Sequence, residues 1–112
     1  MGRAKLMILV LPHNLVMTPS QALKMHRQAV LQIVLAHNAT NARVFGSVSQ
    51  GLDDESSDLD ILVDPTPMTS LFDIGAIRRE LKQLLGVKVD VLTPNALPDS
   101  FRSQVLSLAQ PI

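Results

Sequence analysis

The sequence of 112 residues has no cysteine, no tryptophan and no tyrosine. The absence of cysteine excludes a disulfide framework and any thiolate metal site. It also fits a reducing compartment, so the cytoplasm is the expected location. Aromatic residues make up only 3% of the chain, whereas apolar residues make up 46%, so the core has to be built from aliphatic side chains. This length and composition predict one folded α/β domain.

An excess of charge of either sign is also absent, because ten basic residues balance ten acidic ones and the pI is near 6.8. The basic residues are scattered, and no stretch is rich in lysine or arginine. This pattern argues against a protein that binds nucleic acid through bulk electrostatics, so no direct nucleic-acid partner is expected.

Long apolar runs are missing as well. The run at 6–11 is ended by Pro12 and is too short for a membrane-spanning helix, which needs about 20 apolar residues. No small-residue cleavage site follows it, which argues against a signal peptide. Residues 1–16 are assigned as an N-terminal extension, which could be an added edge strand, a disordered arm or a segment upstream of a natural start at Met17. Residues 17–112 are assigned to one domain, and no membrane partner is expected.

Apolar periodicity and turn residues divide this domain into alternating helices and strands. A capping box formed by Thr18 and Gln21, with Pro19 at the first helical position, predicts a helix start. Helices are expected at about 19–37, 70–86 and 98–109, and strands at 42–46, 59–64 and 87–93. This order predicts an α/β (α+β) fold in which helices pack on one face of a small mixed sheet and leave its other face partly open.

An acidic stretch, VFGSVSQGLDDESSDLDILVDP at 44–65, holds six of the ten carboxylates and no basic residue. Residues two apart on a strand point the same way, about 7 Å apart, so Asp58 and Asp60 project together from the polar face of their strand. Asp90 does the same from the strand at 87–93. If the two strands are neighbours, three carboxylates converge, and their repulsion favours a bound Mg²⁺ or Mn²⁺. Solvated strand aspartates are the alternative.

Gly46 and Ser47 lie upstream of these acids, where a strand ends and a brief helical turn is expected. Backbone amides and a hydroxyl in such a turn can hold a phosphate, although a simple turn glycine is the alternative. The stretch is not a Walker P-loop, because no Gly-Lys-Ser/Thr follows. It is not an EF-hand either, because the required glycine and the closing glutamate are missing.

The sequence GS, followed by ten residues and then DLD, resembles the signature of the DNA polymerase β-like nucleotidyltransferase superfamily. More narrowly, the chain from about Met17 resembles the minimal nucleotidyltransferases (MNT), which are typically encoded beside a HEPN-domain protein. Those pairs behave as toxin–antitoxin systems in which the HEPN protein is an RNase toxin. Where the family frequently has GSxARG, this chain has Ser49 and Gln50, which removes a possible ion pair within the acidic loop.

The resemblance implies two-metal chemistry on a nucleotide. Asp58, Asp60 and Asp90 would be the catalytic carboxylates and would bind two Mg²⁺ ions, with Mn²⁺ as a substitute. Gly46 and Ser47 would hold the triphosphate of ATP. Arg43, which precedes them on the same strand, could reach a phosphate, with a solvated or ion-paired arginine as the alternative.

The acceptor implied by the resemblance is a hydroxyl group, that of a tyrosine, on a cognate HEPN toxin. Only 22 residues follow Asp90, so the acceptor site is expected to come from another protein. The chain itself has no tyrosine to modify. One alternative is an antitoxin that neutralises its partner by binding and occlusion, without catalysis. Another is a nucleotidyltransferase for a small molecule such as an aminoglycoside.

Overall fold

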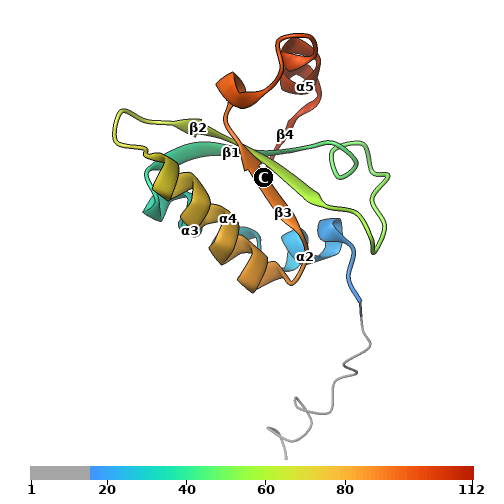
Figure 1. Cartoon of the computed structure of the whole chain (residues 1–112). Helices are drawn as coiled ribbons and strands as arrows, with labels where there is room; N and C mark the ends of the chain where they lie inside the picture. Colours follow the sequence, from blue (N-terminus) through green and yellow to red (C-terminus); the bar gives the residue numbers. More distant parts are fainter. Residues whose placement is uncertain (1–15) are drawn as a thin grey trace, which may run out of the picture.

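The computed structural model describes residues 16–112, so the predicted N-terminal extension lies, apart from Val16, outside the described residues. Four strands form one sheet in the order β3-β2-β1-β4 (Figure 1). The strands are β1 (Ala39–Phe45), β2 (Leu59–Pro65), β3 (Val89–Leu92) and β4 (Gln110–Pro111). The helices are α2 (Pro19–Met25), α3 (Arg27–Ala36), α4 (Leu71–Leu85) and α5 (Arg102–Leu108), with a short 3-10 helix, η1 (Pro94–Ala96). Within this part of the chain, no helix is both long and apolar enough to cross a membrane.

The sheet is mixed, as predicted. Strand β1 runs antiparallel to β2 and to β4, whereas β2 and β3 are parallel neighbours. The parallel pair is joined through α4, which packs against β3. The short β4 is an element that the sequence analysis missed, because two residues carry no alternation from which a strand could be recognised.

The helices α2, α3 and α4 cover one face of the sheet, and their apolar side chains form the core with the inner faces of the strands (Figure 1). This confirms the predicted arrangement of helices on one face of a small mixed sheet. The largest fully buried aliphatic side chains come from β2, α3 and α4; they are Leu59, Ile61, Leu62, Val63, Val30, Val34, Ile77 and Leu81.

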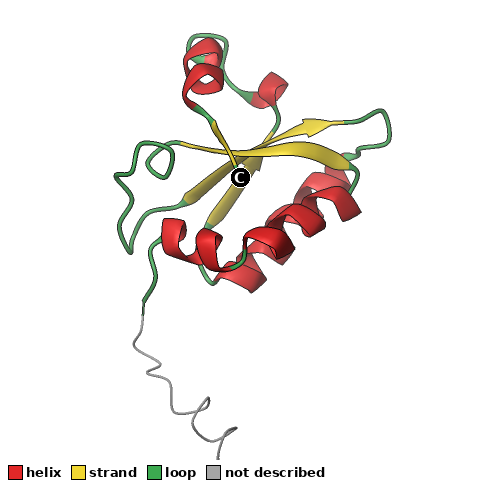
Figure 2. Cartoon of the chain, turned by 180° about the vertical axis from the view of Figure 1, so that it is seen from behind, coloured by secondary structure: helices red, strands yellow, loops and turns green. Residues whose placement is uncertain are grey.

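The opposite face of the sheet is covered at one end by the segment containing η1 and α5 (Figure 2). Leu62 points to this face. The alternation along the strand placed it on the same side as Asp58 and Asp60, yet its side chain is completely buried. Leu97, which directly follows η1, is 2% exposed, and η1 packs against β2. The C-terminal segment therefore seals the sheet around Leu62, and the open part of this face is the end that carries Asp60 and Asp90.

The predicted single helix at 19–37 is wrong in one respect, because the structure divides it at His26. This residue ends α2 and begins α3 with φ −116° and ψ 24°, and its amide donates to the carbonyls of both Ala22 and Leu23. Neither glycine nor proline marks the interruption in the sequence. The start of α2 at the capping box of Thr18 and Gln21 is confirmed.

Candidate active site

The parallel pairing of β2 and β3 brings together the carboxylates that the sequence analysis selected. Asp60 and Asp90 are direct partners in the register of the two strands, and Asp58 directly precedes β2. Val89 and Val91 are buried on the helix side, so the alternation of side chains along β3 turns Asp90 to the opposite face. The condition for convergence, that the two strands are neighbours, is met.

Asp60 is the acid whose charged form this arrangement disfavours. Burial raises the pKa of its carboxyl above the ordinary value, and the charges of Asp90 and Asp58 raise it further. A cation placed between these groups would relieve the repulsion. The chemistry of these oxygen-only donors suits Mg²⁺ or Mn²⁺, and the binding of such an ion stays a prediction.

The carboxylates do not form a complete metal cage by themselves. Among residues 16–112, no three histidine, aspartate or glutamate side chains lie close enough together to hold a metal ion. Mg²⁺ usually takes only one or two carboxylates and completes its shell with water and substrate phosphates. An open set of acids of this kind suits a site in which a nucleotide supplies part of the coordination.

Gly46 lies directly against Asp60. Its φ is +70°, and a Cβ atom added to it would lie only 2.5 Å from Oδ2 of Asp60. Any other residue would therefore be strained in its backbone and would push the Asp60 carboxylate away. The missing side chain of Gly46 leaves the space that the Asp60 carboxylate occupies. Position 46 therefore needs glycine for two reasons, its backbone conformation and this contact.

Ser47 begins the expected turn. Its carbonyl accepts from the amides of Gln50, at 3.2 Å, and Leu52, at 2.9 Å, and the Ser49 hydroxyl donates to the Gly46 carbonyl at 2.9 Å. Within the described part of the chain, neither the amide nor the hydroxyl of Ser47 donates to another protein group. These two donors are therefore available to a phosphate, while Ser49, in place of the family's usual alanine, closes the turn.

Two other acids of the acidic stretch stabilise the loop that carries the site. Asp53 accepts from the amide of Ser20, at 2.8 Å, and from its hydroxyl, at 2.6 Å. Although partial burial raises the pKa of Asp53, these hydrogen bonds outweigh it and hold the pKa below the ordinary value. Asp54 accepts from the amide of Ser56 at 2.9 Å and closes a local turn. The sequence analysis missed both roles. Ser20, the partner of Asp53, lies 33 residues away in α2, whereas the partner of Asp54 lies only two residues away and could have been recognised from the local turn pattern.

Replacing Asp53 with asparagine is expected to lower the free energy of unfolding by about 1 kcal/mol at pH 7, because a charged acceptor at the first turn of α2 becomes a neutral one. The folded pKa of Asp53 lies below the ordinary value of 3.8. Its contribution is therefore present above that value and is lost as the pH falls through the folded pKa. Urea unfolding at pH 7 and pH 3 measures it. Glu55→Gln, an exposed change in the same loop, serves as the control. An equal loss for both variants would contradict the prediction.

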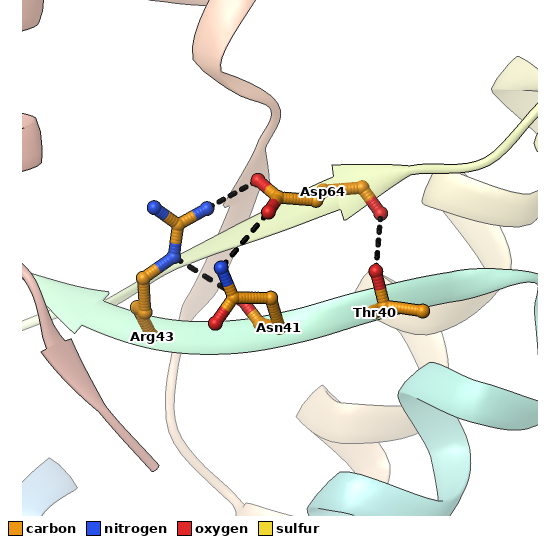
Figure 3. Close-up of polar contacts among 4 residues, drawn as sticks. All are labelled: Thr40, Asn41, Arg43 and Asp64. Carbon is orange, nitrogen blue, oxygen red and sulfur yellow. Dashed lines mark hydrogen bonds and ion pairs between the residues drawn. The ribbon is translucent and has the colours of Figure 1, made fainter.

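Arg43 is engaged away from the Gly46 turn. Its guanidinium forms an ion pair with Asp64, its Nε donates to the Asn41 carbonyl at 3.1 Å, and Asn41 also donates to Asp64 at 2.8 Å (Figure 3). The Arg43 side chain is only 14% exposed. Asp64 lies four residues beyond Asp60 on β2, towards the far end of the strand. This geometry corresponds to the ion-paired alternative for Arg43, and contact with a phosphate stays a prediction.

Two hollows border the carboxylates, and Asp58 and Lys88 line both of them. The larger, of about 730 Å³, lies between the loop at 55–58, the end of α4 and the first described residues. The smaller, of about 340 Å³, lies at the outer edge of β3 and also contains Asp90. Asp58 is thus open to solvent from two sides and Asp90 from one, whereas Asp60 lines neither hollow.

A family model described as the nucleotidyltransferase domain matches residues 23–111. The chain belongs to this family. A protein of Methanocaldococcus jannaschii that is named as a protein adenylyltransferase is 35% identical over 83 residues, which are 74% of this chain and 89% of that protein. A solved structure described as a minimal nucleotidyltransferase superposes with a TM-score of 0.73 at 36% identity, over 90% of this chain and 98% of that one. The predicted enzyme class, a nucleotidyltransferase, is confirmed.

The same fold occurs in a solved toxin–antitoxin complex with AMP-PNP. That structure superposes on this nucleotidyltransferase with a TM-score of 0.64 at 20% identity, over 75% of this chain and 69% of the other. At this identity the likeness concerns the fold. The resemblance to the minimal nucleotidyltransferases that the GS and DLD residues indicate is thus confirmed by a family match and by a close structural neighbour.

Proposed function

We propose that this nucleotidyltransferase is an antitoxin that transfers AMP from ATP to a hydroxyl group, that of a tyrosine, on a cognate HEPN-domain RNase toxin. The observation that carries the proposal is the placement of Asp60 between its register partner Asp90 and the Gly46 turn. Asp60, with Asp90 beside it, thus lies next to the turn whose Ser47 donors we propose to bind phosphate. The name of the M. jannaschii relative and the fold shared with a toxin–antitoxin complex support the protein acceptor.

The reaction follows from what these residues can bind and move. Asp58, Asp60 and Asp90 would hold Mg²⁺, which when bound neutralises phosphate charge and makes the acceptor hydroxyl more acidic. The free amide and hydroxyl of Ser47 bind the triphosphate beside Gly46. The acceptor oxygen attacks the α-phosphorus in line, the bond to the β-phosphate oxygen breaks, and pyrophosphate leaves. Asp90, exposed at the outer strand of the sheet, accepts the proton of the hydroxyl.

Intact-mass spectrometry of the toxin encoded beside this gene tests the proposal. After incubation with this protein, ATP and Mg²⁺, we expect additions in steps of one AMP. The Asp58→Asn/Asp60→Asn variant is expected to produce none. Because this chain lacks tyrosine, a tyrosyl modification can appear only on the partner. An unmodified toxin in a tight complex would instead support an antitoxin that acts by occlusion.

The occluding antitoxin is kept as a second candidate because of one surface. Met68, which precedes α4, and Leu71 and Phe72, at its start, are 75%, 89% and 88% exposed, which is unusual for three large apolar side chains so close in the sequence. Such a surface can bind a protein without any chemistry. The carboxylate variant separates the two candidates, since an antitoxin that only covers its partner neutralises it without Asp58 and Asp60.

A further inference from the structure

Three basic side chains share the smaller hollow with the candidate catalytic acids. Arg78, Lys82 and Lys88 line it together with Asp58 and Asp90, and we call this hollow the cationic pocket. Arg78 and Lys82 are one turn apart on the same side of α4. Lys88 lies two residues before Asp90 and therefore points to the same side of the β3 backbone. A helix and a strand thus each contribute cations to one hollow at the edge of the sheet.

These cations are not neutralised by the acids beside them. In the part of the chain that the structure describes, the ion pairs join His37 to Glu80, Arg43 to Asp64, and Arg102 to Asp99. Among residues 16–112, the hydrogen bond that the Arg78 guanidinium makes is the donation of its Nε to the Val89 carbonyl at 3.1 Å. That bond anchors the guanidinium at the outer edge of β3 and leaves its two terminal nitrogens for a ligand.

The position of the pocket indicates which reactant it contacts. In the proposed function, the triphosphate lies against Gly46 and Ser47, at the end of β1. Strand β2 separates β1 from β3, so the cationic pocket lies on the other side of the acids. An in-line displacement requires the attacking oxygen to approach opposite the leaving pyrophosphate. The acceptor therefore enters from the side of β3, past the cationic pocket.

We propose that the cationic pocket binds an acidic segment of the acceptor protein next to the hydroxyl that receives AMP. This inference rests on the proposed function and adds a determinant of substrate specificity to it. A protein segment fits better than nucleic acid, because the chain has no net charge and the cations gather in one hollow of about 340 Å³ rather than along a stripe. Lys82 and Lys88 thus select the hydroxyl by binding carboxylates beside it, while Asp58, Asp60 and Asp90 perform the transfer.

The test compares two double variants that remove the same charge. Lys82→Gln/Lys88→Gln changes the pocket, whereas Lys24→Gln/Arg79→Gln removes two exposed cations that do not line it. Initial rates of AMP transfer to the neighbouring toxin are measured against toxin and ATP concentration. We expect the pocket variant to raise KM for the toxin by about tenfold with an unchanged KM for ATP. The control variant should change neither.

Other results would overturn the proposal. A higher KM for ATP in the pocket variant would show that the cations bind the nucleotide phosphates. Equal effects of both variants on the KM for the toxin would show that net charge, and not the pocket, determines toxin binding. A further contrary result is a 20-nucleotide single-stranded RNA that binds the wild-type protein and the control variant but not the pocket variant. That result, with an unchanged KM for the toxin, would assign the pocket to nucleic acid. If the wild-type protein transfers no AMP, the proposed function fails. The Kd of the toxin complex then tests the pocket, and equal Kd values for the two variants would overturn it.

Discussion

Asp60→Asn is expected to abolish nucleotidyl transfer and, at the same time, to make the nucleotide-free protein more stable. Transfer should fall about a thousandfold or more, because the central carboxylate of the site no longer binds the cation. The free energy of unfolding should rise by about 0.2–1 kcal/mol at pH 7, the size of side-chain pair interactions across neighbouring strands, because the half-buried charge and its repulsion by Asp90 and Asp58 are removed.

The stabilisation by Asp60→Asn should depend on pH with a defined sign. Burial and the charges of Asp90 and Asp58 raise the folded pKa of Asp60 above 3.8. The wild-type protein therefore has its full stability below the ordinary carboxyl pKa and loses part of it as the pH rises through the folded pKa. The variant does not lose this part. Its advantage should be present at pH 7 and absent at pH 3, as measured by urea unfolding at both values.

Asp64→Asn is the matched control for this prediction. Asp64 lies on the same strand and pairs with Arg43, so its loss should lower stability by about 1 kcal/mol and leave transfer largely intact. A lower stability of Asp60→Asn than of the wild-type protein at pH 7 would show that the Asp60 carboxylate makes stabilising contacts, and that repulsion is not its main interaction.

Gly46→Ala is the second substitution with a large expected effect. The left-handed backbone at φ +70° costs a residue with a Cβ atom about 1–2 kcal/mol. The new methyl group would also meet Oδ2 of Asp60 at 2.5 Å, so the carboxylate has to move. A displacement of about 1 Å in a catalytic group lowers transfer by about a hundredfold. Thermal unfolding and the initial rate of AMP transfer measure the two effects separately.

Gly51→Ala separates backbone strain from the contact with Asp60. Gly51 closes the same turn with φ +71°, but a Cβ atom there would meet nothing within 4 Å. We therefore expect both alanine variants to lose similar stability, whereas only Gly46→Ala loses transfer. If both variants lost transfer equally, the conformation of the turn, rather than the space beside Asp60, would explain the effect.

The arrangement of the acidic stretch explains most of its unusual composition. Asp58 and Asp60 belong to the candidate active site, while Asp53 and Asp64 bind Ser20 and Arg43 elsewhere in the fold. The sequence analysis identified the first two because they alternate on one strand downstream of a Gly-Ser turn. It attributed part of the acidic excess to a metal site and had no account of Asp53 and Asp64, whose partners Ser20 and Arg43 lie outside the stretch.

Local patterns in the sequence determined the elements and the identity of the candidate catalytic residues. The capping box at Thr18, the left-handed Gly86 after α4 and the alternation along β2 each depend on residues a few positions apart. Such interactions are present in the sequence itself, because the backbone period decides which side chains share a face. The same locality explains why the Gly-Ser turn and the Asp-x-Asp pair could be recognised together.

Only the tertiary structure decided which of these elements meet. The parallel contact of β2 with β3 aligns Asp60 with Asp90, which is 30 residues away in the sequence. The same folding brings Asp60 against Gly46 and covers Leu62 with the segment after β3. These contacts depend on the path of the whole chain and on the burial of a shared core, and no local pattern encodes that path. The sequence therefore determined which side chains could do the chemistry, and the packing of the sheet determined that they lie together.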